Sequence, residues 1–448
     1  MASSVSGASS VNSNTGLGSG IDVNAFVQSA LANDQASIVQ LQNQQSNINT
    51  QSKALAQITS DLNALQSAVF VLKDPLGSLA AQSATSSNTA VLTASASSTA
   101  VAGTHTITVN NLATTSSYYT DPVASSGAAL GVGSFQLQVG SATPVTITVD
   151  STNNTLDGLI ASINNLAIGV RASVIDDANG ARLALVSETT GAPGDITVSG
   201  NTASLNFTKA VTGTNASLTV DGVPVSSTGN AVNGVINGVT INLASAAPNA
   251  STTLTVAPDT TQATNALNQF VSAYNAAVKG INAQFAVAAD GSGGGPLEAD
   301  GSLREAQSAL LGAISYSVQG NNGFVNLQSI GISLNNDGTL SVNQSTLSTN
   351  LAGSFSSIQN FLQSSANGFA NNLDTVLTNL SDPSTGTLGL DAKSLQQSSQ
   401  DLSSNIADLQ ASLAVKQQNL ILVYSQVNAT LEELPLLQRQ LGQQLGSL

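Results

Sequence analysis

The chain has 448 residues, of which 41% are hydrophobic and only 8% are charged, and its net charge at pH 7 is −15. Its length supports about two to four domains. The acidic balance argues against binding to nucleic acid or to an anionic membrane surface, because both require Lys and Arg. Cysteine is absent, which excludes disulfides, thiolate metal sites and cysteine nucleophiles.

Residues 1–20 are rich in Ser, Gly and Asn, and we expect them to be flexible when the protein is alone. They contain neither the basic region nor the apolar region of a secretory signal peptide. The chain contains no apolar run long enough for a transmembrane helix, so we expect no membrane insertion. The sequence therefore predicts a cytoplasmic protein or one exported by a route that leaves the N-terminus uncleaved.

Two stretches near the N-terminus have the periodicity of helices. Asp22 can cap a short helix, which the polar residues at 35–37 are expected to loosen. From about residue 40 to 72, apolar residues recur every seven positions, which keeps one side of a helix against a partner. Lys73-Asp74-Pro75 is expected to end this helix. The heptad residues are Leu41, Ile48, Leu55, Leu62 and Val69, with a second row at Ile58, Leu65 and Leu72.

Between residues 81 and 259 the hydrophobic period changes from seven to two, as in half-buried β-strands. The stretch 170–185, for example, alternates on both sides of an Asp-Asp-Ala-Asn-Gly turn. One short helix interrupts the strands, with Leu156, Leu159 and Ile163 on one face. This part of the chain is therefore predicted to be mainly antiparallel β structure.

Helical periodicity returns at about residue 262. A capping box at Ser302–Glu305 is expected to begin one helix, and a hairpin over Ile330–Val342 is expected to turn at Asn336-Asp337-Gly338. The chain closes with a second heptad ladder. Its apolar residues are Ile406, Leu413, Leu420, Val427, Leu434, Leu441 and Leu448.

The two ladders determine the predicted architecture, because each requires a partner. We predict an α+β multidomain protein whose N- and C-terminal helices pair in a coiled-coil-like rod. Two mainly antiparallel β domains are inserted at the distal end of this rod. Pro435 lies inside the second ladder, where it removes a helical hydrogen bond, and it predicts a bend or a helix break near Leu434.

Polar residues interrupt the heptads, for example Gln44 and Gln51 in the first ladder and Lys416 in the second. Such positions weaken an intramolecular seam but can leave a face for other partners. We therefore predict intersubunit or filament contacts mainly within residues 22–40 and 417–448. The predicted contact residues are Phe26, Val27, Leu31, Leu41, Ile48, Leu420, Val427, Leu431, Leu434, Leu441 and Leu445.

The sequence predicts no catalytic residue, no cofactor and no metal site, and hence no enzyme. No strand precedes Gly16–Gly20, as a phosphate-binding loop would require, so a flexible arm is favoured. Asn335–Gly338 resembles part of a calcium loop, but Gln344 stands where that loop needs Glu. His105 is the only histidine and lies in an alternating strand, whereas Asp176-Asp177 is interpreted as part of a turn.

Several short motifs occur in an order and spacing typical of one family. Gly16–Asp22 is similar to its opening motif, and Gly103–Val109 is similar to its first β motif. Ile163-Asn164-Asn165 is similar to the IN motif that hook-associated proteins and flagellins share. Phe270–Asn275 and Asp337–Leu340 are similar to its middle and late segments. Over essentially its whole length, the chain resembles the flagellar filament cap family, also called the hook-associated protein 2 family.

The resemblance implies a homo-oligomeric ring at the distal tip of the bacterial flagellar filament. The terminal helices would reach into the filament, and exported flagellin would fold and insert beneath a plate of β domains. The resemblance also implies secretion by the flagellar type III apparatus and a cytosolic export chaperone at the C-terminal helix. The hook–filament junction protein would be a partner during initial assembly. Some members bind host mucin, and no motif in this chain decides that property.

The same resemblance gives a division into four domains: a terminal helical domain, a helical rod with a β-hairpin, a first β domain, and a second β domain with the IN motif. In that order they are D0 (1–40 plus 416–448), D1 (41–80 plus 262–415), D2 (81–112 plus 207–261) and D3 (113–206).

Two alternatives share some of these features. Flagellins and hook–filament junction proteins have terminal helices and the IN motif, but we expect them to lack Asp221-Gly222 together with Ile330-Gly331-Ile332. A secreted adhesin with glycan-binding β domains would need aromatic platforms, and this chain has no Trp and five Tyr. The filament cap is therefore the favoured interpretation.

Overall fold

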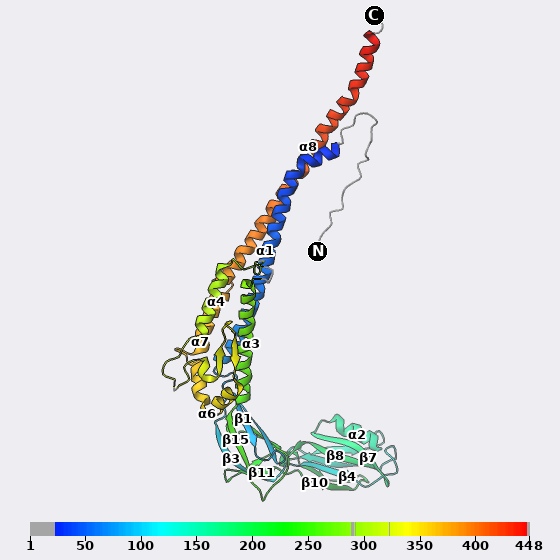
Figure 1. Ribbon diagram of the computed structural model, residues 1–448. Coiled ribbons are helices and arrows are strands. Elements are labelled where there is room, and N and C mark those ends of the chain that lie inside the picture. The colour runs from blue at the N-terminus through cyan, green and yellow to red at the C-terminus, as the bar shows by residue number, and fades with distance from the viewer. Residues whose placement is uncertain (1–22, 288–290, 292, 322, 446–448) are drawn as a thin grey trace.

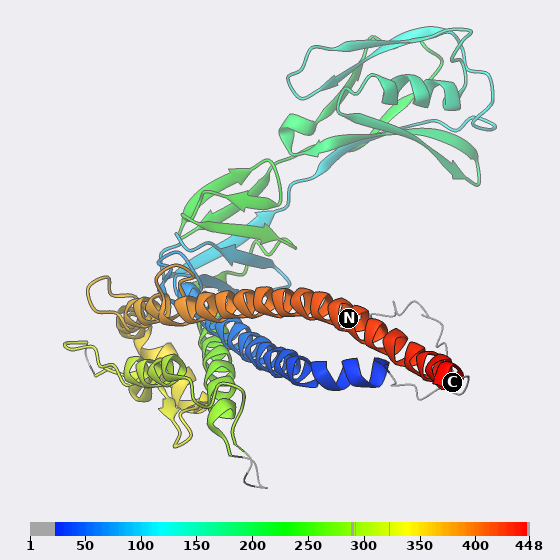
Figure 2. The ribbon, with the colours of Figure 1, turned by 90° about the horizontal axis from the view of Figure 1, so that it is seen from above.

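The structure, a computed structural model, describes residues 23–287, 291, 293–321 and 323–445. Figure 1 shows a long helical rod with two β domains at one end, and the second β domain lies to the side of the rod axis. Seen from above in Figure 2, the two longest helices of the rod run beside one another. The predicted α+β architecture, with paired terminal helices and inserted β domains, is confirmed.

The rod is built on two long helices, α1 (Val23–Lys73) and α8 (Thr387–Leu445). Shorter helices surround the half of the rod that lies nearest the β domains (Figure 1). They are α3 (Thr260–Phe285), α4 (Gly301–Ile314), α5 (Leu327–Ile330), α6 (Gln344–Gln363) and α7 (Phe369–Ser381).

One hydrophobic core fills this half of the rod. Phe369 of α7 packs edge-on against Phe270 of α3, with ring centroids 5.9 Å apart, and stacks on Phe361 of α6. Burying each large apolar side chain contributes about 1.5–3 kcal/mol, so the core holds α1 firmly against its neighbours. The α1 heptad residues in this half are each at most 1% exposed: Leu55, Ile58, Leu62, Leu65, Val69 and Leu72.

Aspartates cap the first two helices that follow the β region. The Asp259 carboxylate accepts hydrogen bonds from the backbone N–H groups of Thr261 and Gln262 and begins α3. Asp300 caps α4 by accepting from the Leu303 N–H at 3.1 Å. The predicted capping box at Ser302–Glu305 is therefore wrong, because the carboxylate two residues earlier takes the capping position.

The predicted hairpin is confirmed as β16 (Ile332–Leu334) and β17 (Leu340–Val342). Gly338 has φ +82° in its turn, a conformation that suits glycine. The Asp337 carboxylate accepts a hydrogen bond from the Thr339 N–H, which closes the turn.

The first β domain lies next to the rod and has its own core between two antiparallel sheets. The five-stranded sheet has the order β1 (Gln82–Ser86), β15 (Thr252–Pro258), β3 (Gly103–Asn111), β11 (Ala216–Val220) and β12 (Val223–Ser227). The three-stranded sheet has the order β13 (Ala231–Asn233), β14 (Val239–Leu243) and β2 (Leu92–Ala96). β1 follows the end of α1 and β15 precedes the start of α3, and the two strands pair with one another, so two adjacent strands join this domain to the rod.

The second β domain is inserted into the first and contains a third core. Its four-stranded sheet has the order β10 (Phe207–Val211), β4 (Thr115–Thr120), β8 (Gly180–Thr190) and β7 (Val170–Asp177). Its three-stranded sheet has the order β6 (Val145–Val149), β5 (Gly133–Val139) and β9 (Ile196–Ser199). Two helical pieces complete it, α2 (Leu156–Asn165) and the 3₁₀ turn η1 (Ala192–Gly194).

Two predicted interruptions of the long helices are wrong. α1 runs unbroken through residues 35–37, where the exposed polar side chains lie on a helix that Leu31 and Ile38 anchor by burial. α8 likewise continues as one helix through Pro435, so the predicted break near Leu434 is wrong, whereas the alternative of a bend there stays a prediction. Proline costs one backbone hydrogen bond there, and the surrounding residues are exposed, so water can hydrate the freed carbonyl.

Two carboxylates meet where α8 passes the start of α4. The Ser302 hydroxyl lies 2.6 Å from Asp300 Oδ1 and 3.0 Å from Asp391 Oδ2. Burial and the neighbouring Asp300 carboxylate raise the pKa of Asp391. The fold therefore favours the protonated form of Asp391, whose contribution to stability is lost as pH rises through its folded-state pKa.

We expect Asp391→Asn to raise the thermal unfolding midpoint at pH 7, because the amide removes a charge yet still accepts the Ser302 hydrogen bond. The gain over wild type should vanish below about pH 4, where the carboxyl is protonated in both states. Thermal scans across this pH range measure the difference. Asp408→Asn, at an exposed position of α8, is the matched control and should change little. An unchanged or lower midpoint for Asp391→Asn at pH 7 would contradict the expectation.

A second prediction concerns Tyr274, which is fully buried in the rod core while its hydroxyl has no hydrogen-bond partner among the described residues. Tyr274→Phe removes this unpaired polar group and should raise the free energy of unfolding by about 1 kcal/mol. Denaturant titration measures the change. Tyr316→Phe is the control, because its hydroxyl donates to the Asn367 carbonyl and its loss should not stabilise. A destabilised Tyr274→Phe protein would refute the assignment.

Candidate assembly interface

Beyond the packed helices, the described part of the rod narrows to α1 and α8 (Figure 1). Three contacts give their register. The rings of Phe26 and Tyr424 are 5.4 Å apart, Asp34 pairs with Lys416 at 2.7 Å, and Ser399 donates to the Asn49 side chain at 2.9 Å. Each step toward the N-terminus of α1 matches a step toward the C-terminus of α8, so the two helices are antiparallel. Lys416, a polar position in the second ladder, thus forms an ion pair within the chain.

α8 extends well past the start of α1. α1 begins at Val23, close to the Phe26–Tyr424 contact, whereas α8 continues to Leu445. At 1.5 Å per residue, about 30 Å of α8 lies beyond that contact. Within the described part of the chain, no other helix packs along this terminal segment, residues 425–445, which projects at the red end of α8 in Figure 1.

The terminal segment exposes the apolar residues of the second ladder. Val427, Leu434, Leu441 and Leu445 are 42%, 47%, 57% and 67% exposed. Heptad spacing places them along one side of the helix. Large apolar side chains that gather on one exposed face mark a contact surface for a protein partner. The segment therefore has the geometry of an interface that lacks its partner.

The other predicted contact residues differ in burial. Phe26 is 53% exposed, and Leu41, Ile48, Leu420 and Leu431 are half-buried. Phe26, Leu41, Ile48 and Leu420 are thus partly exposed along the two-helix part of the rod, and Leu431 is partly exposed on the terminal segment.

Val27 and Leu31, in contrast, are only 2% and 1% exposed within the single chain. Their apolar surface is already covered, so we do not assign them to the interface. Their helical spacing indicated an apolar face correctly, but periodicity does not distinguish an intramolecular partner from a second subunit.

Four further exposed apolar residues of α8 were not among the predicted contact residues. Leu422, Val423, Leu436 and Leu437 are 63%, 53%, 58% and 50% exposed. Val423 and Leu437 follow ladder residues by three positions and lie on the same side of the helix. Leu422 and Leu436 lie about half a turn away and fourteen residues apart, and single exposed apolar residues of this kind are normal on a protein surface. The paired apolar residues at 422–423 and 436–437 were the available signal in the sequence.

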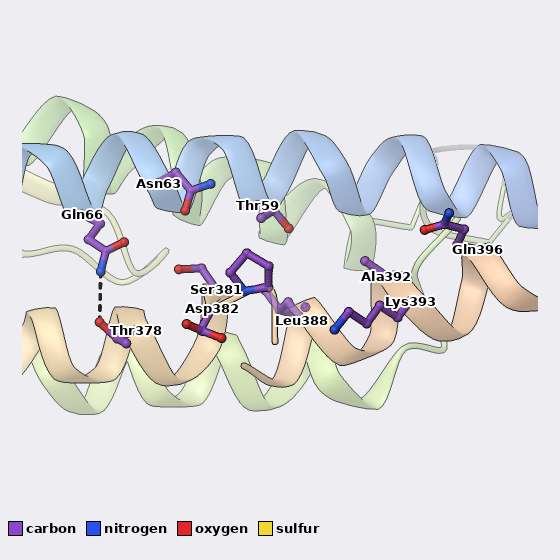
Figure 3. Close-up of a pocket in the computed structure, with 12 residues that line it drawn as sticks. Thr59, Asn63, Gln66, Thr378, Ser381, Asp382, Leu388, Ala392, Lys393 and Gln396 are labelled. Carbon is purple, nitrogen blue, oxygen red and sulfur yellow. Dashed lines mark hydrogen bonds between the residues drawn. The ribbon is translucent and has the colours of Figure 1, made fainter. Parts of the chain in front are cut away.

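A hollow of about 380 Å³ lies between α1, α7 and the first turns of α8 (Figure 3). Across it, Gln66 of α1 donates to the Thr378 hydroxyl at 3.0 Å. Asp382 accepts a backbone hydrogen bond from Ser384, which lowers the pKa of its carboxyl. A Cβ at Gly389 would collide with the Asp382 carbonyl oxygen, so the close turn between α7 and α8 requires glycine there. The Ser381 hydroxyl, also in the lining, donates to the Leu377 carbonyl, so the hollow is a tightly built corner of the rod.

The remaining candidate sites have structural partners. His105 Nδ1 lies 2.7 Å from Asp221 Oδ2, a contact that joins β3 to the β11–β12 turn. Asp177 accepts from Arg182 Nε at 2.7 Å, across the turn between β7 and β8. Among the described residues, no group of acidic or histidine side chains could hold a metal, and no helix could span a membrane. Gly16–Gly20 and Asp22 lie outside the described residues.

Comparison with known proteins agrees with this geometry. The family model for the C-terminus of flagellar hook-associated protein 2 matches residues 213–434, and the model for its N-terminus matches residues 19–116. The B-type flagellar hook-associated protein 2 of Pseudomonas aeruginosa is 32% identical over 328 residues, covering 65% of this chain and 68% of that protein. This chain belongs to the flagellar hook-associated protein 2 family.

A solved structure of the family covers most of the fold. The D1-D2-D3 domains of the flagellar cap protein FliD from Escherichia coli match with a TM-score of 0.57 and 26% identity, over 77% of this chain and 99% of that one. Flagellar hook-associated protein 2 of Helicobacter pylori is 32% identical over 140 residues, 31% of this chain and 20% of that protein. Members of the hook-associated protein 2 family are structural filament caps, and this chain is a cap protein of the flagellar filament tip.

Proposed function

We propose that copies of this chain form a ring on the distal end of the flagellar filament and promote the folding and insertion of exported flagellin beneath it. The observation that carries the proposal is the exposed apolar seam of residues 425–445, which extends beyond the start of α1. An apolar seam of this length gains stability only when another surface covers it. Neighbouring copies and the filament end are the partners that the cap role supplies.

The mechanism we propose is mechanical. The rod would stand on the filament, and the β domains would form a plate that keeps an arriving flagellin chain in a confined space. Folding beneath the plate needs excluded volume and temporary docking positions. It does not need a nucleophile, an acid–base pair or a bound metal, in keeping with the sequence prediction that the protein is not an enzyme.

The division into D0, D1, D2 and D3 is part of this proposal. The three hydrophobic cores favour separate D1, D2 and D3 units, because buried residues cluster within 55–79 plus 263–388, 91–113 plus 216–256, and 130–205. The two-helix part of the rod lies outside these cores and corresponds to the proposed D0 and the adjoining end of D1.

We propose further partners for the period before assembly. An apolar helix surface that is exposed in the cytosol before export is prone to aggregation. We therefore expect an export chaperone to bind the end of α8. Secretion through the flagellar export apparatus would then deliver the chain to the tip. The hook–filament junction protein would receive the first ring.

The test replaces two seam residues with charges. Leu434→Lys/Leu441→Lys should leave the thermal midpoint of the isolated protein nearly unchanged, because both side chains are about half exposed. Cells that carry this variant should have short filaments and shed flagellin monomer into the medium. Filament length by microscopy and flagellin in the supernatant measure the effect.

Gln440→Lys/Gln443→Lys is the matched control. It adds the same charge to the same helix, and Gln443 lies about two and a half turns from Leu434, on the opposite side. This control should support filaments of normal length. Normal filaments in the Leu434→Lys/Leu441→Lys strain would overturn the role given to the seam.

A further inference from the structure

Three asparagines make the same paired contact with the backbone. In each case one side-chain amide accepts a hydrogen bond from the N–H of a distant residue and donates to the C=O of that same residue. The pairs are Asn164 with Ala172, Asn275 with Leu340, and Asn230 with Ala113.

The distances are those of good N–H···O hydrogen bonds. Asn164 Oδ1 lies 2.8 Å from the Ala172 nitrogen, and its Nδ2 lies 3.0 Å from the Ala172 oxygen. For Asn275 and Leu340 the two distances are 2.6 and 2.8 Å. In an antiparallel sheet, two opposite residues exchange both of these bonds. The asparagine amide therefore replaces one residue of a neighbouring strand.

Two of these contacts lie on the outer edge of a sheet. β7 is the last strand of its four-stranded sheet, and Ala172 faces Leu185 of β8 on its inner side. β17 belongs to a two-stranded sheet, and Leu340 faces Leu334 of β16 on its inner side. Asn164 near the end of α2 and Asn275 of α3 thus meet the strands from the side where another strand could add.

We propose that Asn164 and Asn275 close the outer edges of β7 and β17 to strand addition by extended polypeptides. An open edge offers unpaired N–H and C=O groups, which pair readily with any extended chain. The clamp satisfies the N–H and C=O groups of Ala172 on β7 without adding a strand. The inference does not rest on the proposed function, although a cap that receives unfolded chains would need such protection.

Other edges of the β domains carry different obstacles to pairing. Pro224 lies in the edge strand β12 and lacks an N–H. The register of the edge strand β10 shifts between Lys209 and Val211, which bends the strand away from regular pairing. Closed edges therefore recur in both β domains, and the asparagine clamps are one device among several.

A graded set of variants tests the clamp by amide hydrogen exchange in the full chain. Asn164→Ala removes both bonds and should make the Ala172 N–H exchange at least about fivefold faster. Asn164→Asp keeps the acceptor and should leave the Ala172 N–H protected, although the C=O loses its donor. Asn165→Ala, at the neighbouring exposed position, should exchange as wild type does. Equal protection of Ala172 in wild type and Asn164→Ala would overturn the clamp.

A second measurement tests closure of the edge itself. A synthetic peptide with the sequence of residues 170–177 is added to each protein, and exchange at Ala172 and Val174 is followed. The peptide should slow exchange at these positions in Asn164→Ala and leave wild type and Asn165→Ala unchanged. Slowing in wild type, or no slowing in Asn164→Ala, would overturn the proposal that the asparagine keeps strands away. The same comparison at Leu340 uses Asn275→Ala.

Discussion

The antiparallel packing of α1 against α8 is the constraint on which the whole molecule depends. The two helices come from opposite ends of the described chain, and everything between Lys73 and Thr387 is inserted between them. Closing this pair joins residues more than three hundred positions apart, such as Asn49 and Ser399. Contacts of such long sequence separation form late in folding and slow it. The β domains lie between α1 and α3 in the chain, and the β1–β15 pair keeps the end of α1 near the start of α3.

The same constraint explains why the rod has two different parts. Near the β domains, α3, α6, α7 and α8 pack against α1, and its heptad residues are fully buried. Farther out only α8 remains, and two helices cannot bury the sides of one another that face outward. Half-buried Leu41 and Ile48 mark this change. The assembly surface of the chain is thus the part of the rod that its own helices leave uncovered.

Periodicity predicted much of this fold, because burial acts on it directly. The seven-residue spacing located α1 and the outer part of α8, and alternation located the β region and the 330–342 hairpin. Local signals were less reliable. The Ser302 capping box was overridden by Asp300, and Pro435 did not break a helix that is exposed on all sides. α7 was not predicted, and Val27 and Leu31, which were predicted as intersubunit contacts, are buried within the single chain, because a sequence pattern does not say what covers an apolar face.

The scarcity of charge in this chain has a consequence for where it can work. With 10 basic residues in 448, most contacts along the rod join apolar groups, amides and hydroxyls. Dissolved salt screens charges over about 10 Å at 0.1 M but hardly alters hydrogen bonds between neutral groups. A flagellar tip stands in whatever water surrounds the cell, from dilute to saline. A rod held together in this way keeps its geometry over a wide range of salt concentrations. A cell does not control the salt concentration outside its envelope.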